Sequence, residues 1–359
     1  MARLGDYINI RTGKLDANAS SEDGQYPFFT CSVNSLRIDT YSYDCECALV
    51  AGNGDLNVKY YNGKFNAYQR TYIIESKDKS ILSVPYLYYF LDRYVEELRK
   101  QSIGGVIKYI KIGNLTEARI PMRSILEQGV VVVNLKKVND LITLRKRQLS
   151  KLDELVKSRF VEMFGEPTIN SKGWPVARLS ELGELNRGVS KARPRNSPDL
   201  LGGPYPLVQT GEVANSGLYI RHYNATYSEK GLAQSRLWNS GTLCITIAAN
   251  IAQTSILTFD ACFPDSVVGF VANERTNSVF VHFWFTFFQR ILESQAPQVA
   301  QKNINLKILS ELNVITPPLA LQQEFAAFVE KVDKLEFKAK ASLEKLETLK
   351  KAMMQKYFG

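Results

Sequence analysis

Clusters of Asn, Gln, Arg, Lys, Ser and Thr recur in turn-rich segments of this sequence, and their chemistry suits contact with DNA. Arg and Lys form hydrogen bonds with guanine, and Asn and Gln with adenine. Phosphates accept hydrogen bonds from Lys, Arg, Ser and backbone N–H groups. The segment with the most charge is Arg187–Arg195 (RGVSKARPR), which has four positive charges in nine residues, and Gly188 and Pro194 shape it as a loop. We interpret it as a phosphate-binding loop.

The candidate DNA-binding residues lie in ten such clusters, five in each half of the chain. Each cluster taken singly also fits an ordinary surface turn, because Asn-Gly pairs mark hairpins and exposed Gln and Arg are common. In the first half the candidates are Thr12, Lys14, Asn34, Asn57, Lys59, Gln69, Arg70, Lys108 and Lys111. In the second half they are Arg187, Ser190, Lys191, Arg193, Arg195, Gln209, Thr210, Gln234, Arg236, Asn250, Gln253, Gln301, Lys302 and Asn303.

Signatures of catalysis are missing from the sequence. It has no GxxxxGK[ST] phosphate loop, no HExxH, no GxSxG and no [DN]PP[YF] motif, and Gly52-Asn53-Gly54 is typical of a hairpin turn. The only histidines are His222 and His282, and Cys45 and Cys47 form a CxC without a second pair. We therefore expect no catalytic residue, no metal site and no cofactor in this chain.

Composition sets broader limits. The 359 residues suggest two domains, and the net charge of +9 permits an anionic partner such as nucleic acid. No apolar run approaches the ~18–20 residues of a membrane span, so no membrane partner is expected. Five cysteines, an odd number, and an N-terminus without an apolar signal core indicate the cytoplasm.

The chain is an internal duplication. Residues Val138–Gly165 align with Val332–Gly359 at an offset of 194 without a gap, and ten of the 28 positions are identical. Ala2-Arg3-Leu4 aligns with Ala177-Arg178-Leu179 at an offset of 175. The second copy therefore carries about 19 extra residues (194 − 175) in its first part. Two domains with one frame and different loops are predicted.

Each copy divides into a globule and a long helix. Short apolar runs between Gly and Asn turns predict a mixed α/β globule, and a proline-free apolar stripe predicts the helix. The expected boundaries are 1–125 for globule one, 126–166 for helix one, 167–318 for globule two and 319–359 for helix two. We expect the helices to pack as an antiparallel coiled coil with pseudo-two-fold symmetry; the alternative is that each folds back on its own globule. The packing residues would be Leu141, Leu149, Leu152, Leu155, Leu335, Leu343, Leu346 and Leu349.

This organisation resembles the specificity subunit of type I restriction–modification systems. The segments that carry the resemblance include LGDYINIRTGKLDANAS, GKFNAYQRTYII, RGVSKARPRNSPDLLGGPYPLVQTGEV and GTLCITIAANIAQTSILTFDACFPDSVVGF, with the helix entries around Gln128 and Gln322. The resemblance implies a non-catalytic subunit whose two domains each read half of a split site in double-stranded DNA. It also implies that the helices set the spacing and dock two modification subunits, which bring S-adenosylmethionine and methylate adenine N6. Restriction subunits that use ATP and magnesium would join them.

Two alternatives from other classes remain at this point. The chain could be a stand-alone DNA-modifying enzyme with an unfamiliar site, or a coiled-coil scaffold that binds only proteins. A helix of about 35 residues spans roughly 50 Å, and DNA half-sites one turn apart lie ~34–36 Å apart. The helices are thus long enough to hold two globules on neighbouring turns of a duplex.

Overall fold

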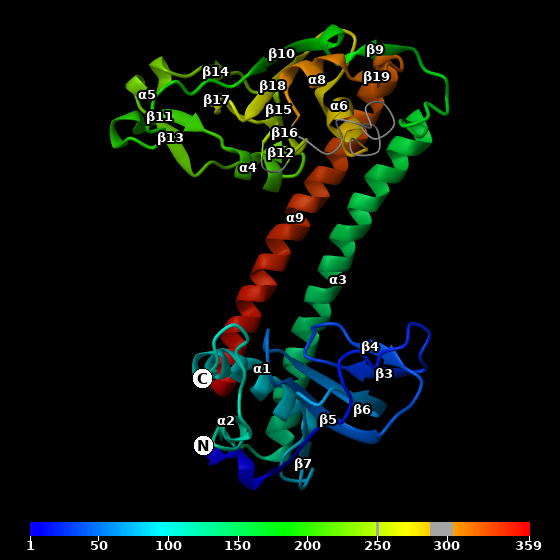
Figure 1. Ribbon diagram of the computed structural model, residues 1–359, viewed down its shortest axis with the longest axis vertical. Coiled ribbons are helices and arrows are strands. Elements are labelled where there is room, and N and C mark those ends of the chain that lie inside the picture. Colours follow the sequence, from blue (N-terminus) through cyan, green and yellow to red (C-terminus); the bar gives the residue numbers. More distant parts are fainter. Residues whose placement is uncertain (249–250, 288–303) are drawn as a thin grey trace. The chain divides into compact units, whose positions relative to one another are not determined.

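A computed structural model describes residues 1–248, 251–287 and 304–359 (Figure 1). Both α-helices and β-sheets are present, in agreement with the mixed α/β class. The contacts divide the chain into two compact units: unit 1 is Met1–Arg147 with Lys340–Gly359, and unit 2 is Gln148–Ala339. The units differ from the four consecutive segments expected, because each one combines a globule with parts of both long helices.

Unit 1 is built on a six-stranded sheet with the order β2-β7-β5-β6-β3-β4. The strand β5 is a run of nine residues, YDCECALVA, whose last five residues are all buried. The helix α1 covers the sheet; Ser83 caps its first turn and Pro85 lies at its start, where proline is tolerated. The strands are β1 (Ala2–Arg3), β2 (Ile8–Thr12), β3 (Tyr26–Phe29), β4 (Leu36–Ile38), β5 (Tyr43–Ala51), β6 (Val58–Ala67), β7 (Thr71–Ser76) and β8 (Arg119–Ile120). The helices are η1 (Leu4–Asp6), α1 (Val84–Gln101), α2 (Ile112–Thr116) and α3 (Ile125–Phe164).

Unit 2 contains a five-stranded sheet, β10-β18-β15-β16-β12, a four-stranded sheet, β13-β11-β17-β14, and the pair β19-β9. Its strands are β9 (Val176–Arg178), β10 (Gly183–Arg187), β11 (Leu201–Leu207), β12 (Tyr219–Ile220), β13 (Ala225–Tyr227), β14 (Leu237–Trp238), β15 (Leu243–Thr246), β16 (Thr254–Leu257), β17 (Ala261–Cys262), β18 (Val267–Ala272) and β19 (Asn313–Ile315). Its helices are η2 (Leu179–Glu181), η3 (Pro198–Leu200), α4 (Thr210–Asn215), α5 (Glu229–Ala233), α6 (Ser278–Phe285), α8 (Leu306–Glu311) and α9 (Leu319–Phe358).

The duplication is visible in the strand registers. In unit 1, Ala2 pairs with Ile120. In unit 2, Ala177 pairs with Val314, and these partners are displaced by the offsets of 175 and 194 found in the sequence. The 3-10 turn that follows the strand begins with a fully buried leucine in both units. The two copies therefore share one frame, as the sequence predicts.

Each long helix begins in one unit and ends in the other. The helix α3 begins in unit 1, and its last residue, Phe164, contacts Phe280 of α6 in unit 2 at 4.9 Å between ring centroids. The helix α9 begins in unit 2, and Phe358 contacts Tyr86 of α1 in unit 1 at 5.1 Å. Each helix therefore ends on the globule of the other copy, and the alternative of a helix folded back on its own globule is wrong.

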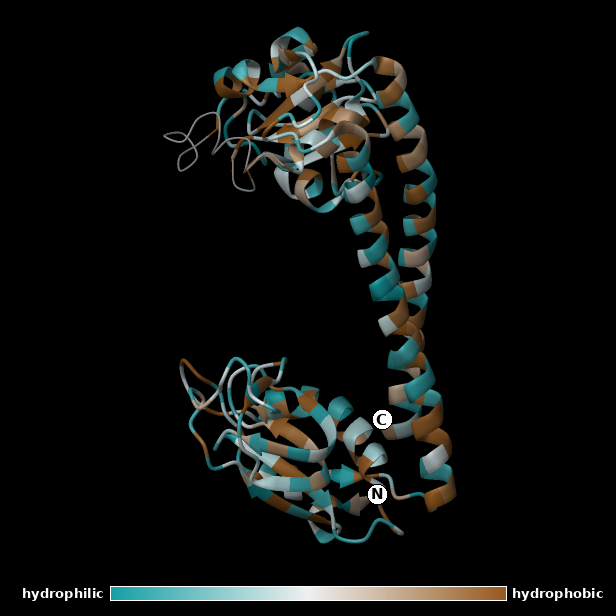
Figure 2. Ribbon diagram, turned by 90° about the vertical axis from the view of Figure 1, so that its right-hand side faces the viewer, coloured by the Kyte–Doolittle hydropathy of each residue, from teal (hydrophilic) through white to brown (hydrophobic). Residues whose placement is uncertain are grey.

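Within unit 1 the two helices run antiparallel. Asn134 donates to the hydroxyl of Tyr357 at 3.4 Å, and Lys146 pairs with Glu347 at 3.0 Å. As the residue number rises along α3, it therefore falls along α9. Figure 2 shows apolar residues recurring along both helices.

The eight leucines of the expected packing stripe differ in burial, and their packing between the two helices stays a prediction. Leu149, Leu152, Leu343 and Leu346 are part-buried, whereas the remaining four are 46–51% exposed: Leu141, Leu155, Leu335 and Leu349. The buried stripe of α3 passes through Val138 and Ile142, the residue next to Leu141. Leucine and isoleucine are equally apolar, so hydropathy alone cannot fix the phase of a stripe that has a second apolar face beside it.

Candidate DNA-recognition surfaces

In unit 1, hydrogen bonds bring two of the predicted polar clusters together. The backbone N–H of Gly13 donates to Thr71 O at 3.1 Å, and that of Lys14 donates to Ala67 O at 3.2 Å. Residues 12–14 therefore lie beside the turn 68–70. A Cβ on Gly13 would lie 2.2 Å from Ala67 O, so only glycine permits this approach.

The remaining clusters of unit 1 join the same surface. The N–H of Gly52 donates to Arg70 O at 2.8 Å, and that of Gly54 donates to Lys108 O at 2.9 Å. The Asn57 amide donates to Cys31 O at 2.8 Å, next to residues 32–35. All five clusters thus lie side by side, and we call this surface the polar edge of unit 1. It consists of residues 12–14, 32–35, 53–59, 68–70 and 104–111.

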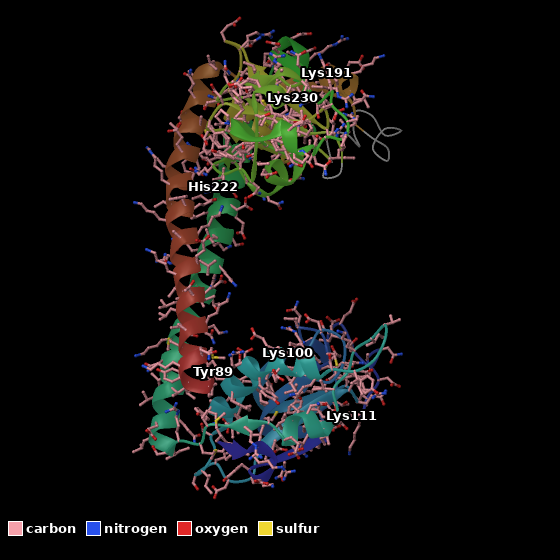
Figure 3. The ribbon with its side chains drawn as sticks, turned by 90° about the vertical axis from the view of Figure 1, so that its left-hand side faces the viewer. Tyr89, Lys100, Lys111, Lys191, His222 and Lys230 are labelled. Atoms are coloured by element: carbon pink, nitrogen blue, oxygen red, sulfur yellow. The ribbon has the colours of Figure 1, made fainter. Side chains whose placement is uncertain are left out.

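Most candidate side chains on the polar edge are exposed. Gln69 donates to the Asp16 carboxylate at 3.0 Å, so its amide already has one partner. Figure 3 shows Lys111 at the surface of unit 1. The exposed candidates are Thr12, Lys14, Asn34, Gln69, Arg70, Lys108 and Lys111.

Asn57 and Lys59 have structural partners. The Asn57 amide donates to the backbone carbonyls of Cys31 and Asp55 at 2.8 and 2.9 Å. Lys59 Nζ donates to the carbonyl oxygen of the Asn57 side chain. Burial lowers the pKa of Lys59 from its ordinary value. These two residues therefore brace the loop, and DNA contact by either one would require these hydrogen bonds to change.

In unit 2 the loop Arg187–Arg195 is tied to Asp265. Arg187 donates to the backbone carbonyl of Asp265 at 2.9 and 2.7 Å. Arg195 donates to both carboxylate oxygens of Asp265 at 2.7 and 2.9 Å. Arg193 donates to the carbonyls of Ser190 and Ala192, both at 2.8 Å. The arginines of the loop thus hold it in place by hydrogen bonds. Lys191 of the same loop is exposed, and its side chain has no partner within the described part of the chain.

Asp265 is a residue that sequence reasoning missed. Its carboxylate neutralises the Arg195 guanidinium, which the sequence alone presents as a phosphate ligand. Arg195 and Asp265 are 70 positions apart, so no local pattern links them. The only signal in the sequence was the crowding of four positive charges in the loop, which favours a nearby carboxylate.

A second cluster of unit 2 braces the same loop. The Gln234 amide oxygen accepts from Ala192 N at 3.0 Å, and its nitrogen donates to Gly231 O at 3.0 Å. The Arg236 guanidinium stacks over the Trp238 ring, 4.0 Å from the centroid, and reaches the Glu184 carboxylate at 3.4 Å. The structure therefore joins residues 187–195 and 234–236.

Of the other candidates of unit 2, Ser190 belongs to the loop itself, where it is 6% exposed and its carbonyl accepts from Arg193. Three others lie outside the loop in the sequence: Gln209 is exposed and is the N-cap residue of α4, Thr210 is part-buried, and Gln253 is exposed. Four candidates lie outside the described residues: Asn250, Gln301, Lys302 and Asn303.

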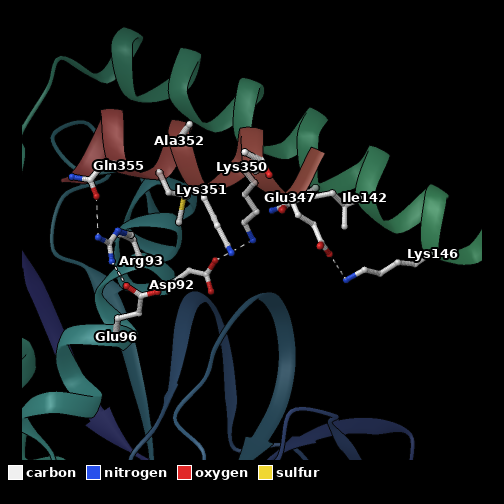
Figure 4. Close-up of a pocket in the computed structure, with 13 residues that line it drawn as sticks. Asp92, Arg93, Glu96, Ile142, Lys146, Glu347, Lys350, Lys351, Ala352 and Gln355 are labelled. Carbon is white, nitrogen blue, oxygen red and sulfur yellow. Dashed lines mark hydrogen bonds and ion pairs between the residues drawn. The ribbon is translucent and has the colours of Figure 1, made fainter. Parts of the chain in front are cut away.

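A groove of about 750 Å³ lies in unit 1 between α1, α3 and α9 (Figure 4). Most of its charged side chains pair with one another. Asp92 pairs with Lys350 at 3.4 Å, and Arg93 donates to the Gln355 amide oxygen at 3.0 Å. These contacts attach the end of α9 to α1, so the groove serves the architecture of the unit.

The described parts of the chain offer no metal site and no membrane-spanning helix. Within residues 1–248, 251–287 and 304–359, no group of three His, Cys, Asp or Glu side chains could hold a metal ion. Nor is any helix of these ranges long and apolar enough to cross a membrane. All five cysteines are free thiols.

A family model described as the type I restriction modification DNA specificity domain matches residues 1–154 and 171–348. The chain belongs to this family. Two copies of the specificity domain account for the duplication, and each match covers a globule and part of the helix that follows it. The chain is thus a type I restriction–modification specificity subunit with two DNA-recognition domains.

Relatives of this specificity subunit cover nearly its whole length. The type I restriction enzyme EcoDI specificity subunit of Escherichia coli is 29% identical over an alignment 392 residues long. The alignment covers 99% of this chain and 86% of the relative. The MjaVIII specificity subunit of Methanocaldococcus jannaschii is 22% identical over 99% of this chain and 90% of its own length. The fold is shared with the S subunit of M. genitalium, with a TM-score of 0.69, 16% identity and coverage of 100% and 95% of the two chains. A chain from a study of complex assembly and conformational transition of the type I R-M system matches with a TM-score of 0.55 and 15% identity, over 99% and 96%.

Proposed function

We propose that each domain of this specificity subunit reads one half of a bipartite, asymmetric site in double-stranded DNA. The observation that supports the proposal is that the two domains share one backbone frame but carry different candidate DNA-binding surfaces. Ala2 and Ala177 hold equivalent strand positions, whereas side chains differ at equivalent positions of the two surfaces: Thr12 and Lys14 of the polar edge correspond to Arg187 and Val189. A common frame would dock both domains on DNA in the same way, and different loops would select different bases.

We further propose that catalysis belongs to partner subunits. Two modification subunits would bring S-adenosylmethionine and methylate adenine N6, and restriction subunits would use ATP and magnesium. The half-exposed leucines support two docking sites, since Leu141 and Leu335 occupy equivalent positions, as do Leu155 and Leu349. Half-exposed apolar side chains that recur in both copies suit two identical partners. A methyltransferase must turn its base out of the helix, so a separate subunit that holds the duplex need not react.

The long helices would set the distance between the half-sites. Each has 40 residues, which at ~1.5 Å per residue give roughly 60 Å. Half-sites on successive turns lie ~34–36 Å apart, so each helix is longer than the separation that it would define.

Sequencing the methylated sites in cells that carry this chain with its modification subunit tests the proposal. We expect a split motif. Adding one helical turn to both α3 and α9 should widen the gap and leave the half-site sequences unchanged. Exchanging residues 1–120 for another recognition domain should alter one half-site only. Altered half-sites with an unchanged gap, or changes in both half-sites after the exchange, would contradict it.

Two further measurements separate the proposal from its rivals. Methyl transfer from labelled S-adenosylmethionine to DNA by the purified chain alone would favour a stand-alone enzyme. Absence of sequence-selective DNA protection, even with the modification subunit present, would favour a protein scaffold. We expect neither result.

A further inference from the structure

The segment between α1 and α2 exposes apolar side chains at the polar edge of unit 1. Val106 is 103% exposed and Ile107 is 62% exposed. They form the tip of residues 103–109, which we call the tip loop; it belongs to the teal segment between α1 and α2 in Figure 1. Val106 and Ile107 are adjacent and form one exposed apolar patch, and such patches are typical of surfaces that bind a partner.

The tip loop has a defined stem. Ile103 N donates to Tyr109 O at 3.0 Å, and Tyr109 N donates to Ile103 O at 2.8 Å. Gly104 has a φ of +117°, a conformation that L side chains rarely adopt. The stem is also bonded to the neighbouring turn, because Gly54 N donates to Lys108 O. The loop thus presents its tip from a fixed base, next to the other clusters of the polar edge.

Charge around the tip loop favours an anionic partner. Lys108 and Lys111 are exposed, and residues 102–116 contain no Asp or Glu. The nearest turn contributes Asp55, whose carboxylate pairs with Arg99 at 3.2 Å. An aliphatic tip flanked by lysines fits a partner that combines apolar and anionic groups. Duplex DNA does so, since its apolar surfaces are the thymine methyl groups and the base faces, and phosphates flank both.

We propose that the tip loop enters a groove of the duplex, where Val106 and Ile107 make apolar contact with bases while Lys108 and Lys111 bind the flanking phosphates. The inference rests on the proposed DNA-reading function and adds a specificity element to it. Aliphatic side chains gain nothing from phosphates, so the tip discriminates sequence. The lysines contribute affinity that depends on salt and not on sequence.

The test uses the full chain with its modification subunit and two fluorescent duplexes, one with the bipartite motif and one with both half-sites scrambled. The double variant V106S/I107S should lower affinity for the motif at least fivefold, because base contacts carry discrimination of that order. Affinity for the scrambled duplex and the salt dependence should stay unchanged. The variant K108A/K111A should weaken both duplexes and reduce the salt slope by about two. The control is I169S, since Ile169 is 75% exposed in unit 2 outside every predicted cluster.

Two base substitutions in the DNA show whether the tip loop contacts a thymine methyl group or the face of a base. Uracil in place of thymine in the half-site should lower wild-type affinity where the tip touches a methyl group. Increased 2-aminopurine fluorescence should appear where the tip enters between bases. Absence of both signals overturns the inference, and so does a tip variant that binds the motif like the wild type, loses both duplexes equally or releases the modification subunit. A wild-type complex without preference for the motif would instead overturn the proposed function itself.

Discussion

Gln128 and Gln322 hold equivalent loops by equivalent hydrogen bonds, although they lie in different units. Both side chains are 0% exposed. Gln128 accepts from Ser83 N at 2.9 Å and donates to the carbonyls of Ile81 and Arg123. Gln322 accepts from Asn277 N at 3.0 Å and donates to the carbonyls of Arg275 and Pro317. Each glutamine thus connects the start of a long helix to the residue that caps α1 or α6.

We expect Q322L to lower the free energy of unfolding of unit 2 by at least about 2 kcal/mol, because each buried backbone group left unpaired costs about 1–3 kcal/mol. Q128L should have a similar effect on unit 1. The matched control is Q323L, since Gln323 is exposed one residue away. Urea denaturation measures the difference, and equal midpoints for Q322L and Q323L would contradict the role assigned to this amide.

Asp265 should limit how strongly the isolated chain binds non-specific DNA. Its carboxylate neutralises Arg195 and would repel a phosphate. We expect D265N to raise affinity for a scrambled duplex severalfold and to steepen its dependence on salt, because another cation becomes available to phosphates. The matched control is D153N, which removes the same charge from the surface of α3, where Asp153 pairs with Lys157. Anisotropy titrations at several salt concentrations compare them, and equal effects of the two variants would refute this role.

The exposed leucines of the long helices should decide how many modification subunits bind. L141S should remove one docked subunit and L335S the other, and the double variant should retain neither. Each is about half exposed, so its replacement should change the stability of the chain by less than about 1 kcal/mol. Analytical ultracentrifugation of the assembled complex gives the stoichiometry. A double variant that still binds two subunits would exclude this face as the docking surface.

His282 should make unit 2 less stable in mild acid. Burial lowers its pKa to about 4 from the ordinary 6.5, and its Nδ1 lies 2.9 Å from Thr254 Oγ1. Between pH 6.5 and 4 the unfolded chain binds this proton and the folded chain does not, so stability falls as the pH falls through this range. The full effect is about 3 kcal/mol.

H282Q should remove that part of the pH dependence. Urea unfolding at pH 7 and pH 4.5 gives the stability difference between the variant and the wild type. We expect the difference to shrink at the lower pH, where the wild type has lost the contribution of a neutral His282. A difference that is the same at both pH values would contradict the assignment.

The sequence predicts the frame of this protein better than its surfaces. The aligned pairs Ala2/Ala177 and Gln128/Gln322 locate equivalent strands and helix starts, because burial constrains residue type at such positions. The end-to-end exchange of the helices is also compatible with the apolar stripes. The sequence could not predict which residues of the stripe are buried near Leu141. A shift by one residue, to Ile142, also gives an apolar face.

Partners that are distant in the sequence explain the remaining differences. The sequence presents Arg195 as a candidate phosphate ligand, and only the folded chain brings Asp265 to it. It presents Asn57 as a candidate DNA contact, and in the structure the Asn57 amide donates to the carbonyl of Cys31. Both side chains donate hydrogen bonds, and what the sequence could not predict is that each meets a group of the protein itself.

The exchange of helix ends has a consequence for the order of folding during synthesis. Unit 2 is one continuous stretch, Gln148–Ala339, whereas unit 1 needs Lys340–Gly359 to cover α1. A nascent chain leaves the ribosome from its N-terminus, so the domain that emerges first must wait with an uncovered apolar surface until the final twenty residues arrive. The second domain can reach its native packing earlier, and the last turns of α9 then complete the first.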